Sequence, residues 1–325
     1  MFGLKNPGNT NRFRLALAAC LLFAAVDWWS LPALAEQPFS LGQYLSHALG
    51  KFRGVEETDP IPFEPVACPV SSCSSGADLI PTFQPFFGEP LVDFVRRDFR
   101  FQGRPIDAAT CEKAFSGEIN VMESASRDRS YLDLFEVCEG LAPAGMQYLL
   151  RFSISAVNIS APDPSGINDF IVGGFAPEGD PTCGGNSSYV YSPTHGHCHL
   201  KNLYSFELVD PKSGDLVAGK KMSFATVDST QFCEEAGPFQ YGFETQGITP
   251  GWVDIYGSFL PGNYIVVTEV PAGDYILRAT LNFDDVEGLA SSDCDTANNT
   301  IEMDVRLPPK KAFRQDYAPH LLLHP

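Results

Sequence analysis

The chain of 325 residues has few basic side chains, with 22 Lys and Arg against 40 Asp and Glu and a formal net charge of −18. This shortage argues against nucleic acid and anionic membranes as partners, because both attract basic proteins, and it favours cationic partners. Long apolar runs are absent too. The apolar stretch from Leu15 to Val26 is shorter than the about 20 residues that a membrane-spanning helix needs. No internal repeat stands out, and histidine is scarce.

The N-terminus has the pattern of a secretory signal peptide. Basic residues, including Arg12 and Arg14, precede the apolar stretch, and the small residues Ala33-Leu34-Ala35 follow it as a cleavage site. We therefore expect residues 1–35 to be a signal peptide cleaved after Ala35. The mature protein would be secreted or periplasmic, with no membrane contact after cleavage.

Cysteine use agrees with export. An even number of cysteines follows the expected cleavage site, which is typical of up to four disulfides formed in an oxidising compartment. They are Cys68, Cys73, Cys111, Cys138, Cys183, Cys198, Cys233 and Cys294. Short loop closure suggests the pairs Cys68–Cys73 and Cys183–Cys198.

Three further segments follow the signal peptide. Residues 36–77 are rich in Pro and Ser and read as a linker or propeptide-like segment, with a short amphipathic helix over 41–52. Strand patterns dominate residues 78–308, which we expect to form the main domain. Residues 309–325 are expected to be a C-terminal tail that is loose or packed only locally.

Within the main domain, alternating or apolar runs are separated by Pro, Gly, Asn and Asp. They predict strands over 147–160, 203–210, 263–270, 274–283 and 301–307. Residues 267–277 look like a hairpin, and residues 130–138 predict a short helix. The fold class expected is mostly β, centred on an antiparallel β-sandwich with long loops and few short helices.

Three of the six histidines lie on alternate residues, at His195, His197 and His199. On a strand these side chains point to one face, while Cys198 points to the other. Three imidazoles with an open position suit copper(II) or a catalytic zinc, and the ligand type does not choose between them. A zinc hydrolase would want a nearby carboxylate base, but no carboxylate follows the triplet before Glu207.

Two motifs after the histidines resemble those of the lysyl oxidases, the secreted copper amine oxidases. The first is the Gly-x-Lys-x-Ser-Phe segment at 219–224, and the second is the Gly-x-x-Pro-Gly-x-x-Asp-x-Tyr segment at 247–256. The resemblance runs from about residue 78 to about residue 307, although residues 97–140 match poorly. It implies that His195, His197 and His199 bind copper.

The resemblance also implies a lysyl tyrosylquinone cofactor made from the protein itself. By position, Lys221 supplies the amine and Tyr256 the ring; Lys220 is the alternative lysine, one residue out of register. The reaction implied is the oxidation of a primary amine to an aldehyde, with release of ammonia and hydrogen peroxide. Asp254 is the candidate base because it shares a strand face with Tyr256, and Asp228 is a weaker candidate.

A group of oxygen donors near the C-terminus forms a second candidate ion site. Asp293, Asp295, Asn298 and Asn299 offer hard ligands of the kind that calcium takes, although a capped turn would use the same residues. The resemblance implies a structural calcium ion and adds Asp78 and Leu79 to this set.

The leading hypothesis is therefore an exported copper and quinone amine oxidase acting on peptidyl lysine or on small primary amines. One rival is a secreted β-sandwich that binds copper as a binding module without quinone catalysis, and another is a zinc hydrolase. The expected partner is an amine or a lysine-containing protein, not nucleic acid, and the expected oligomeric state is monomer or weak dimer.

Overall fold

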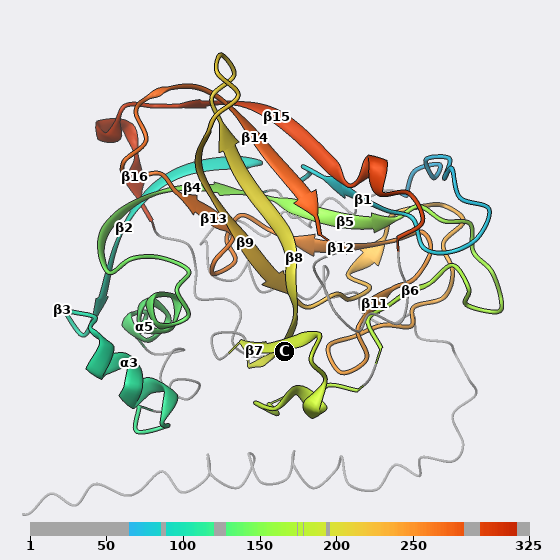
Figure 1. Cartoon of the computed structure of the whole chain (residues 1–325), viewed down its shortest axis with the longest axis horizontal. Coiled ribbons are helices and arrows are strands. Elements are labelled where there is room, and N and C mark those ends of the chain that lie inside the picture. The colour runs from blue at the N-terminus through green and yellow to red at the C-terminus, as the bar shows by residue number, and fades with distance from the viewer. Residues whose placement is uncertain are drawn as a thin grey trace, which may run out of the picture. The chain divides into compact units, whose positions relative to one another are not determined.

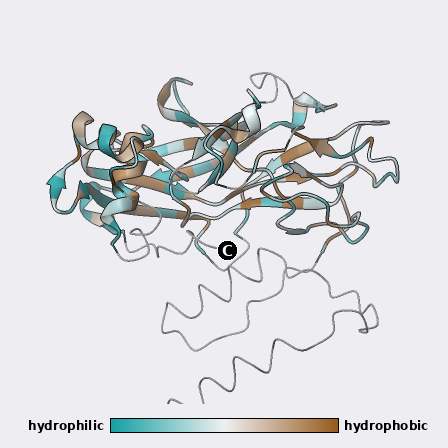
Figure 2. Ribbon diagram, turned by 90° about the horizontal axis from the view of Figure 1, so that it is seen from below, coloured by the Kyte–Doolittle hydropathy of each residue, from teal (hydrophilic) through white to brown (hydrophobic). Residues whose placement is uncertain are grey.

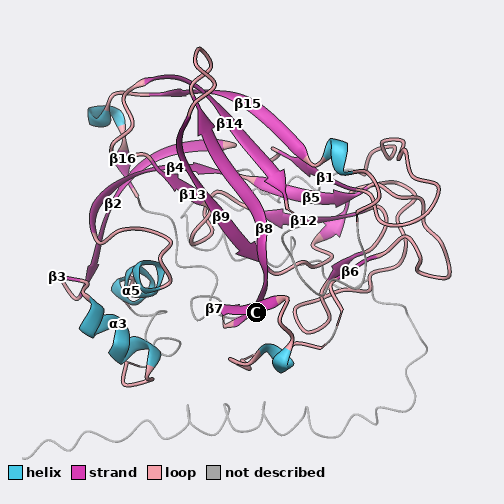
Figure 3. Ribbon diagram, in the orientation of Figure 1, coloured by secondary structure: helices cyan, strands magenta, loops and turns pink. Residues whose placement is uncertain are grey.

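The computed structural model describes residues 65–85, 89–119, 128–173, 175–177, 179–192, 196–282 and 293–316 (Figure 1). The predicted signal peptide and the predicted helix over 41–52 lie outside these residues. Strands make up most of the regular secondary structure in the described residues, as Figure 3 shows in magenta, so the mostly β prediction is confirmed.

The longest strand, β8, belongs to an antiparallel sheet in the order β15–β14–β8–β7, with β9 also paired to β8. Side chains alternate between its buried and exposed faces, as the period of a strand requires. Its members are β7 (Tyr189–Ser192), β8 (His197–Val209), β9 (Leu216–Phe224), β14 (Gly273–Leu281) and β15 (Thr300–Leu307).

Two further sheets contain the remaining long strands. One has the order β13–β4–β2–β16, with β3 paired to β2, and the other has the order β1–β5–β12–β10. The first comprises β2 (Val92–Phe101), β3 (Arg104–Pro105), β4 (Gly145–Phe152), β13 (Tyr264–Val266) and β16 (Arg314–Gln315). The second comprises β1 (Leu79–Thr82), β5 (Ile154–Asn158), β10 (Thr230–Gln231) and β12 (Trp252–Tyr256). A small pair joins β6 (Phe170–Ile171) to β11 (Gly247–Ile248).

The sheets pack face to face around a shared apolar core. In Figure 1, β8, β9 and β14 run at a steep angle to β4 and β5. The rings of Phe152 on β4 and Phe206 on β8 lie 4.7 Å apart, and the Tyr204 hydroxyl donates to the Ser155 carbonyl at 2.9 Å. Hydrophobic and hydrophilic residues alternate along the strands in Figure 2. This arrangement is the sandwich that the sequence predicts.

Two α-helices cover one end of β2. They are α3 (Ala108–Phe115), which begins with an Asp107 cap on Thr110 N, and α5 (Ser130–Cys138), which confirms the predicted helix. A disulfide between Cys111 and Cys138 joins them. Short 3-10 turns occur at η1 (Cys183–Gly185), η3 (Thr296–Asn298) and η4 (Lys310–Ala312). None of the helices in the described part of the chain has the length and apolar character needed to cross a bilayer.

The eight cysteines form four disulfides. The predicted pair Cys183–Cys198 is confirmed. The predicted pair Cys68–Cys73 is wrong, because Cys68 bonds Cys233 and Cys73 bonds Cys294. Both bridges fasten residues 65–77 to segments that are far along the chain, and short loop closure does not reveal such pairings.

Two other expectations about the chain's course are wrong. Residues 267–277 do not form a hairpin, because β13 pairs with β4 whereas β14 pairs with β8 and β15, so the turn carries the chain from one sheet to another. The described part of the C-terminal tail is not loose. There β16 pairs in parallel with β2, and the Asp316 side chain is buried.

Candidate functional site

The histidine motif lies at the start of β8. The rings of His197 and His199 have their centroids 5.0 Å apart, whereas Cys198 between them is buried and bonded to Cys183. The strand therefore separates the imidazoles from the disulfide, as the alternation predicts. The third predicted ligand, His195, lies outside the described residues.

Two contacts orient these rings. The Nδ1 atom of His199 lies 2.9 Å from the Ser223 carbonyl oxygen, and the His199 residue is 5% exposed. Because a carbonyl only accepts, Nδ1 carries a hydrogen, so Nε2 is the ring nitrogen that could bind a metal when the ring is neutral. The His197 ring packs on the Phe243 ring at 4.3 Å. A buried imidazole oriented by a backbone carbonyl fits a histidine copper site.

Tyr256 is the last residue of β12 and is buried against the histidine-bearing sheet. Its ring centroid lies 3.9 Å from that of Phe224, at the end of β9, and 6.3 Å from that of Tyr204. The hydroxyl lies 2.6 Å from the Ala225 carbonyl oxygen and also contacts the Asp254 carboxyl group. Ser223, Phe224 and Ala225 therefore contact His199 at one end and Tyr256 at the other.

Asp254 shares the face of β12 with Tyr256, as predicted, and is 1% exposed. Burial raises the pKa of its carboxyl group to about 8, against the effect of hydrogen bonds that include the one from Tyr256. Burial also raises the pKa of Tyr256 well above the ordinary tyrosine value, and the Asp254 charge adds to this effect. The pair is therefore arranged to share protons rather than to carry two charges.

Asp228, the weaker base candidate, connects two loops through hydrogen bonds. Its carboxyl group accepts hydrogen bonds from the backbone of Gln240, Tyr241 and Thr249, and from the Thr249 hydroxyl. These bonds occupy both oxygens, so Asp254 fits the role of base better.

The two candidate lysines lie on opposite faces of β9. Lys221 is exposed and lies opposite Ser205 of β8, whereas Met222 and Phe224 point to the buried side. Lys220 shares the side of Phe224, donates a hydrogen bond to the Gly262 carbonyl and lies 4.1 Å from the centroid of the Tyr264 ring. Burial lowers the pKa of Lys220 to about 7. Phe224, which packs on Tyr256, thus lies on one face of β9, and the predicted Lys221 lies on the other face.

The candidate calcium residues come together from both ends of the domain. Leu79 N donates to Asp293 Oδ1 at 3.3 Å, and Asn298 Nδ2 donates to Asp78 Oδ1 at 2.8 Å. Three buried oxygens here accept no hydrogen bond: Asp293 Oδ2, Asn298 Oδ1 and Asn299 Oδ1. Burial raises the pKa of Asp293 to about 6. Unpaired buried oxygens from several hard ligands fit a cation such as calcium.

Asp295 stands apart within this set. Its Oδ1 accepts from Ala297 N at 3.0 Å, and its Oδ2 accepts from the Ser72 hydroxyl at 2.6 Å. It therefore serves as the cap of η3, which is the role that the capped-turn alternative describes.

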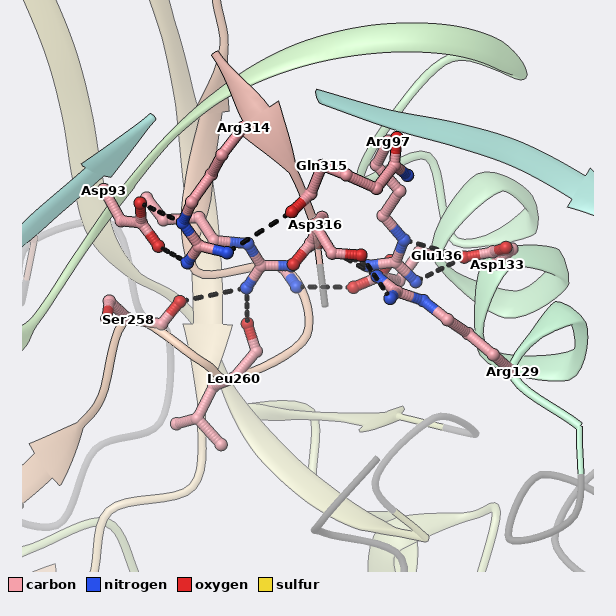
Figure 4. A network of polar contacts seen from close by, with 12 residues as sticks. Asp93, Arg97, Arg129, Asp133, Glu136, Ser258, Leu260, Arg314, Gln315 and Asp316 are labelled. Carbon is pink, nitrogen blue, oxygen red and sulfur yellow. Dashed lines mark hydrogen bonds and ion pairs between the residues drawn. The ribbon is translucent and has the colours of Figure 1, made fainter. Parts of the chain in front are cut away.

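A buried charged network that was not expected from the sequence lies beside Ser258 and Leu260 (Figure 4). The guanidinium group of Arg151 donates to the carbonyls of Ser258 and Leu260, in the loop after Tyr256, and pairs with Asp316 at 3.0 Å. Asp316 also pairs with Arg129 at 2.9 Å. No local pattern reveals this network, because its members are scattered along the chain. Gln246, a buried residue one position before the second motif, was also not expected from the sequence to belong to the site.

Comparison with known proteins agrees with the motifs. Residues 175–314 match the family model for lysyl oxidase. Human lysyl oxidase homolog 3 is 26% identical over 205 residues, which is 62% of this chain and 22% of that protein. Human protein-lysine 6-oxidase is 30% identical over 121 residues, which is 37% of this chain and 28% of that protein.

Human lysyl oxidase homolog 1 is 36% identical over 99 residues, covering 29% of this chain and 17% of that protein. The matches thus cover less than a third of each of these relatives. The family-model match, residues 175–314, includes the histidine strand, both lysines and the Asp254–Tyr256 pair. On this match, residues 175–314 resemble the lysyl oxidase family.

Proposed function

We propose that this protein is an exported amine oxidase that uses copper(II) and a quinone formed from Lys221 and Tyr256. One amine, one O₂ and one water would give one aldehyde, one ammonia and one hydrogen peroxide. Its substrates would be peptidyl lysine or small primary amines, which suit an acidic protein. The four disulfides support an extracytoplasmic location.

One observation carries this proposal. Ser223, Phe224 and Ala225 connect the histidines to the tyrosine: the first contacts His199, and the next two contact Tyr256. A metal held by the histidines would therefore act close to a buried phenol. When bound, the copper and quinone pair would supply the two-electron oxidation of the amine, with O₂ as the final acceptor.

The protein's own residues would manage protons and exclude water. Phe224 and Tyr204 cover the Tyr256 ring, which is 5% exposed. Asp254 is positioned to exchange a proton with Tyr256 Oη, and we assign it as the base that removes the substrate's α-proton. A carboxyl pKa near 8 suits a group that both accepts and returns a proton near neutral pH.

Lys220 and Lys221 lie on opposite faces of β9, and Lys221 lies on the face away from Phe224. This placement favours two alternatives to a quinone formed with Lys221. Lys220, which shares the Phe224 side of β9, is the second candidate for the quinone lysine. Alternatively, the protein binds copper without forming a quinone. Formation of the proposed pair requires β9 to rearrange locally so that Lys221 reaches Tyr256.

A peptide map separates these alternatives. The protein would be loaded with copper(II), incubated in air, digested and searched for a peptide that joins a lysine to Tyr256. We expect the Lys221–Tyr256 crosslink, its loss in Lys221→Ala, and its retention in Lys220→Ala and in the exposed control Lys212→Ala. A crosslink through Lys220 would reassign the lysine. Unmodified Tyr256 in copper-loaded wild-type protein would favour the binding module.

A further inference from the structure

The Gln246 side chain is buried, with the residue 1% exposed. It lies between the histidine strand and residues 224–226, the segment that contacts Tyr256. Its Nε2 donates to the Cys198 carbonyl at 2.5 Å and to the Phe243 carbonyl at 3.2 Å. Its Oε1 accepts from Thr226 N at 3.1 Å. The orientation of the amide is unambiguous, because two partners are carbonyls and the third is an N–H.

Each partner of Gln246 belongs to a different part of the site. Cys198 lies between His197 and His199 in sequence, and the Phe243 ring packs on His197. Thr226 follows Ala225, whose carbonyl accepts a hydrogen bond from the Tyr256 hydroxyl. One amide group therefore connects the backbone of the histidine pair, the residue against the His197 ring and the segment that holds the phenol.

We propose that Gln246 is a positioning residue that sets the placement of His197 and His199 relative to Tyr256. This inference rests on the proposed function, because it assumes that these histidines bind copper. Glutamine suits the role for a chemical reason: one planar group presents two donors and an acceptor in opposite directions. Methionine has similar length but no such hydrogen bonds, and asparagine is too short to reach both sides.

The test compares Gln246→Met with Gln147→Met. Gln147 is also buried, donates to the Ala144 carbonyl at 3.2 Å and accepts from the Thr268 hydroxyl at 2.7 Å, but it lies on β4. Both changes remove a buried amide with both types of hydrogen bond. The measurements are the melting temperature, the dissociation constant for copper(II) and the electron paramagnetic resonance spectrum of the copper(II) protein.

We expect both variants to melt at lower temperature. Gln246→Met should also bind copper(II) at least about tenfold more weakly and change the hyperfine splitting, as loss of groups that orient metal ligands does. Gln147→Met should keep the wild-type copper properties. If Gln246→Met does not fold, Gln246→Asn keeps a buried amide and should show the same changes to a smaller extent.

A Gln246 variant with wild-type copper affinity and spectrum would overturn the inference, as would wild-type protein that binds no copper(II). The fraction of Tyr256 converted per bound copper separates this inference from the proposed function. If wild-type protein binds copper but leaves Tyr256 unmodified, the quinone proposal fails. The comparison of copper spectra still decides whether Gln246 positions the histidines.

Discussion

The Tyr256 hydroxyl contacts two oxygens, the Ala225 carbonyl and the Asp254 carboxyl group, but it has only one hydrogen. The carbonyl has no hydrogen to give, so either the hydroxyl shares its hydrogen between the two oxygens or a protonated Asp254 donates to the hydroxyl. The raised pKa of Asp254 favours the protonated carboxyl group. Burial thus favours the neutral forms of both side chains in the folded protein.

The buried Asp254 should make stability depend on pH. Its folded pKa of about 8 lies above the unfolded value of about 3.9, so between these values the folded state keeps a proton that the unfolded chain loses. The contribution of Asp254 to the free energy of unfolding should therefore fall as pH rises from about 4 to about 8. Asp254→Asn should remove this part of the slope.

The measurement is urea unfolding at several pH values between 5 and 8.5 (roughly the titration window) for wild type and variant. The exposed Asp304 on β15 provides the control, since Asp304→Asn should keep the wild-type slope. Equal slopes in wild type and Asp254→Asn would show that Asp254 does not stay protonated in the folded protein.

At the scale of elements, the strand period decides which neighbours can meet. On β9 it places the adjacent Lys220 and Lys221 on opposite faces. The apolar Met222 and Phe224 mark the buried face of β9 in the sequence, so the sequence pattern predicts that Lys221 points to the exposed face. What the pattern does not show is that Tyr256, on β12, packs against the Phe224 face.

A second element-scale feature is the junction between β1 and the segment before β15. Ala77 pairs with Asp293, and the disulfide Cys73–Cys294 lies beside it. The unpaired oxygens of Asp293, Asn298 and Asn299 collect there. We propose that calcium binds these oxygens and completes the junction.

Calcium should raise the melting temperature and a calcium chelator should lower it, because an ion that binds only the folded state stabilises it. At a calcium concentration of 100 times the dissociation constant, the gain would be about 2.7 kcal/mol. Asp293→Ala should abolish the difference between the two conditions, as differential scanning calorimetry would measure. Asp163→Ala, which removes an exposed aspartate from a surface turn, should preserve it. A chelator without effect on wild type would contradict the site.

At the scale of the whole molecule, Asp316 connects segments that are far apart in the sequence. The carboxyl group of Asp316 is buried and lies within 3.0 Å of both Arg129 and Arg151, and 4.0 Å from Arg97. Arg151 in turn holds the loop after Tyr256. Through Arg151, Asp316 therefore supports the loop at Ser258 and Leu260 (Figure 4).

Asp316→Asn should destabilise the protein by about 3–5 kcal/mol, because it removes the buried carboxylate that pairs with Arg129 and Arg151. The control is Asp274→Asn, which breaks an exposed ion pair with Arg306 at 3.6 Å and should cost less than about 1 kcal/mol. Urea unfolding measures both. Similar small losses in the two variants would mean that the network does not stabilise the fold.

The sequence by itself determined the mostly β class, the helix over 130–138 and the separation of Cys198 from the histidines, because these follow from local periodicity. It also determined that Asp254 and Tyr256 share a face. It could not determine which sheet each strand joins: residues 267–277 read as a hairpin but connect two sheets. A turn pattern describes the local bend and not the partners of the strands that leave it.

Only the tertiary structure decided how distant segments meet. It paired Cys68 with Cys233, gathered three arginines around Asp316, and placed Gln246 between the histidines and Tyr256. The physical reason is the same in each case. Periodicity and capping depend on residues a few positions apart, whereas disulfide geometry, desolvation of a carboxyl group and a shared amide depend on which chain segments the core brings together.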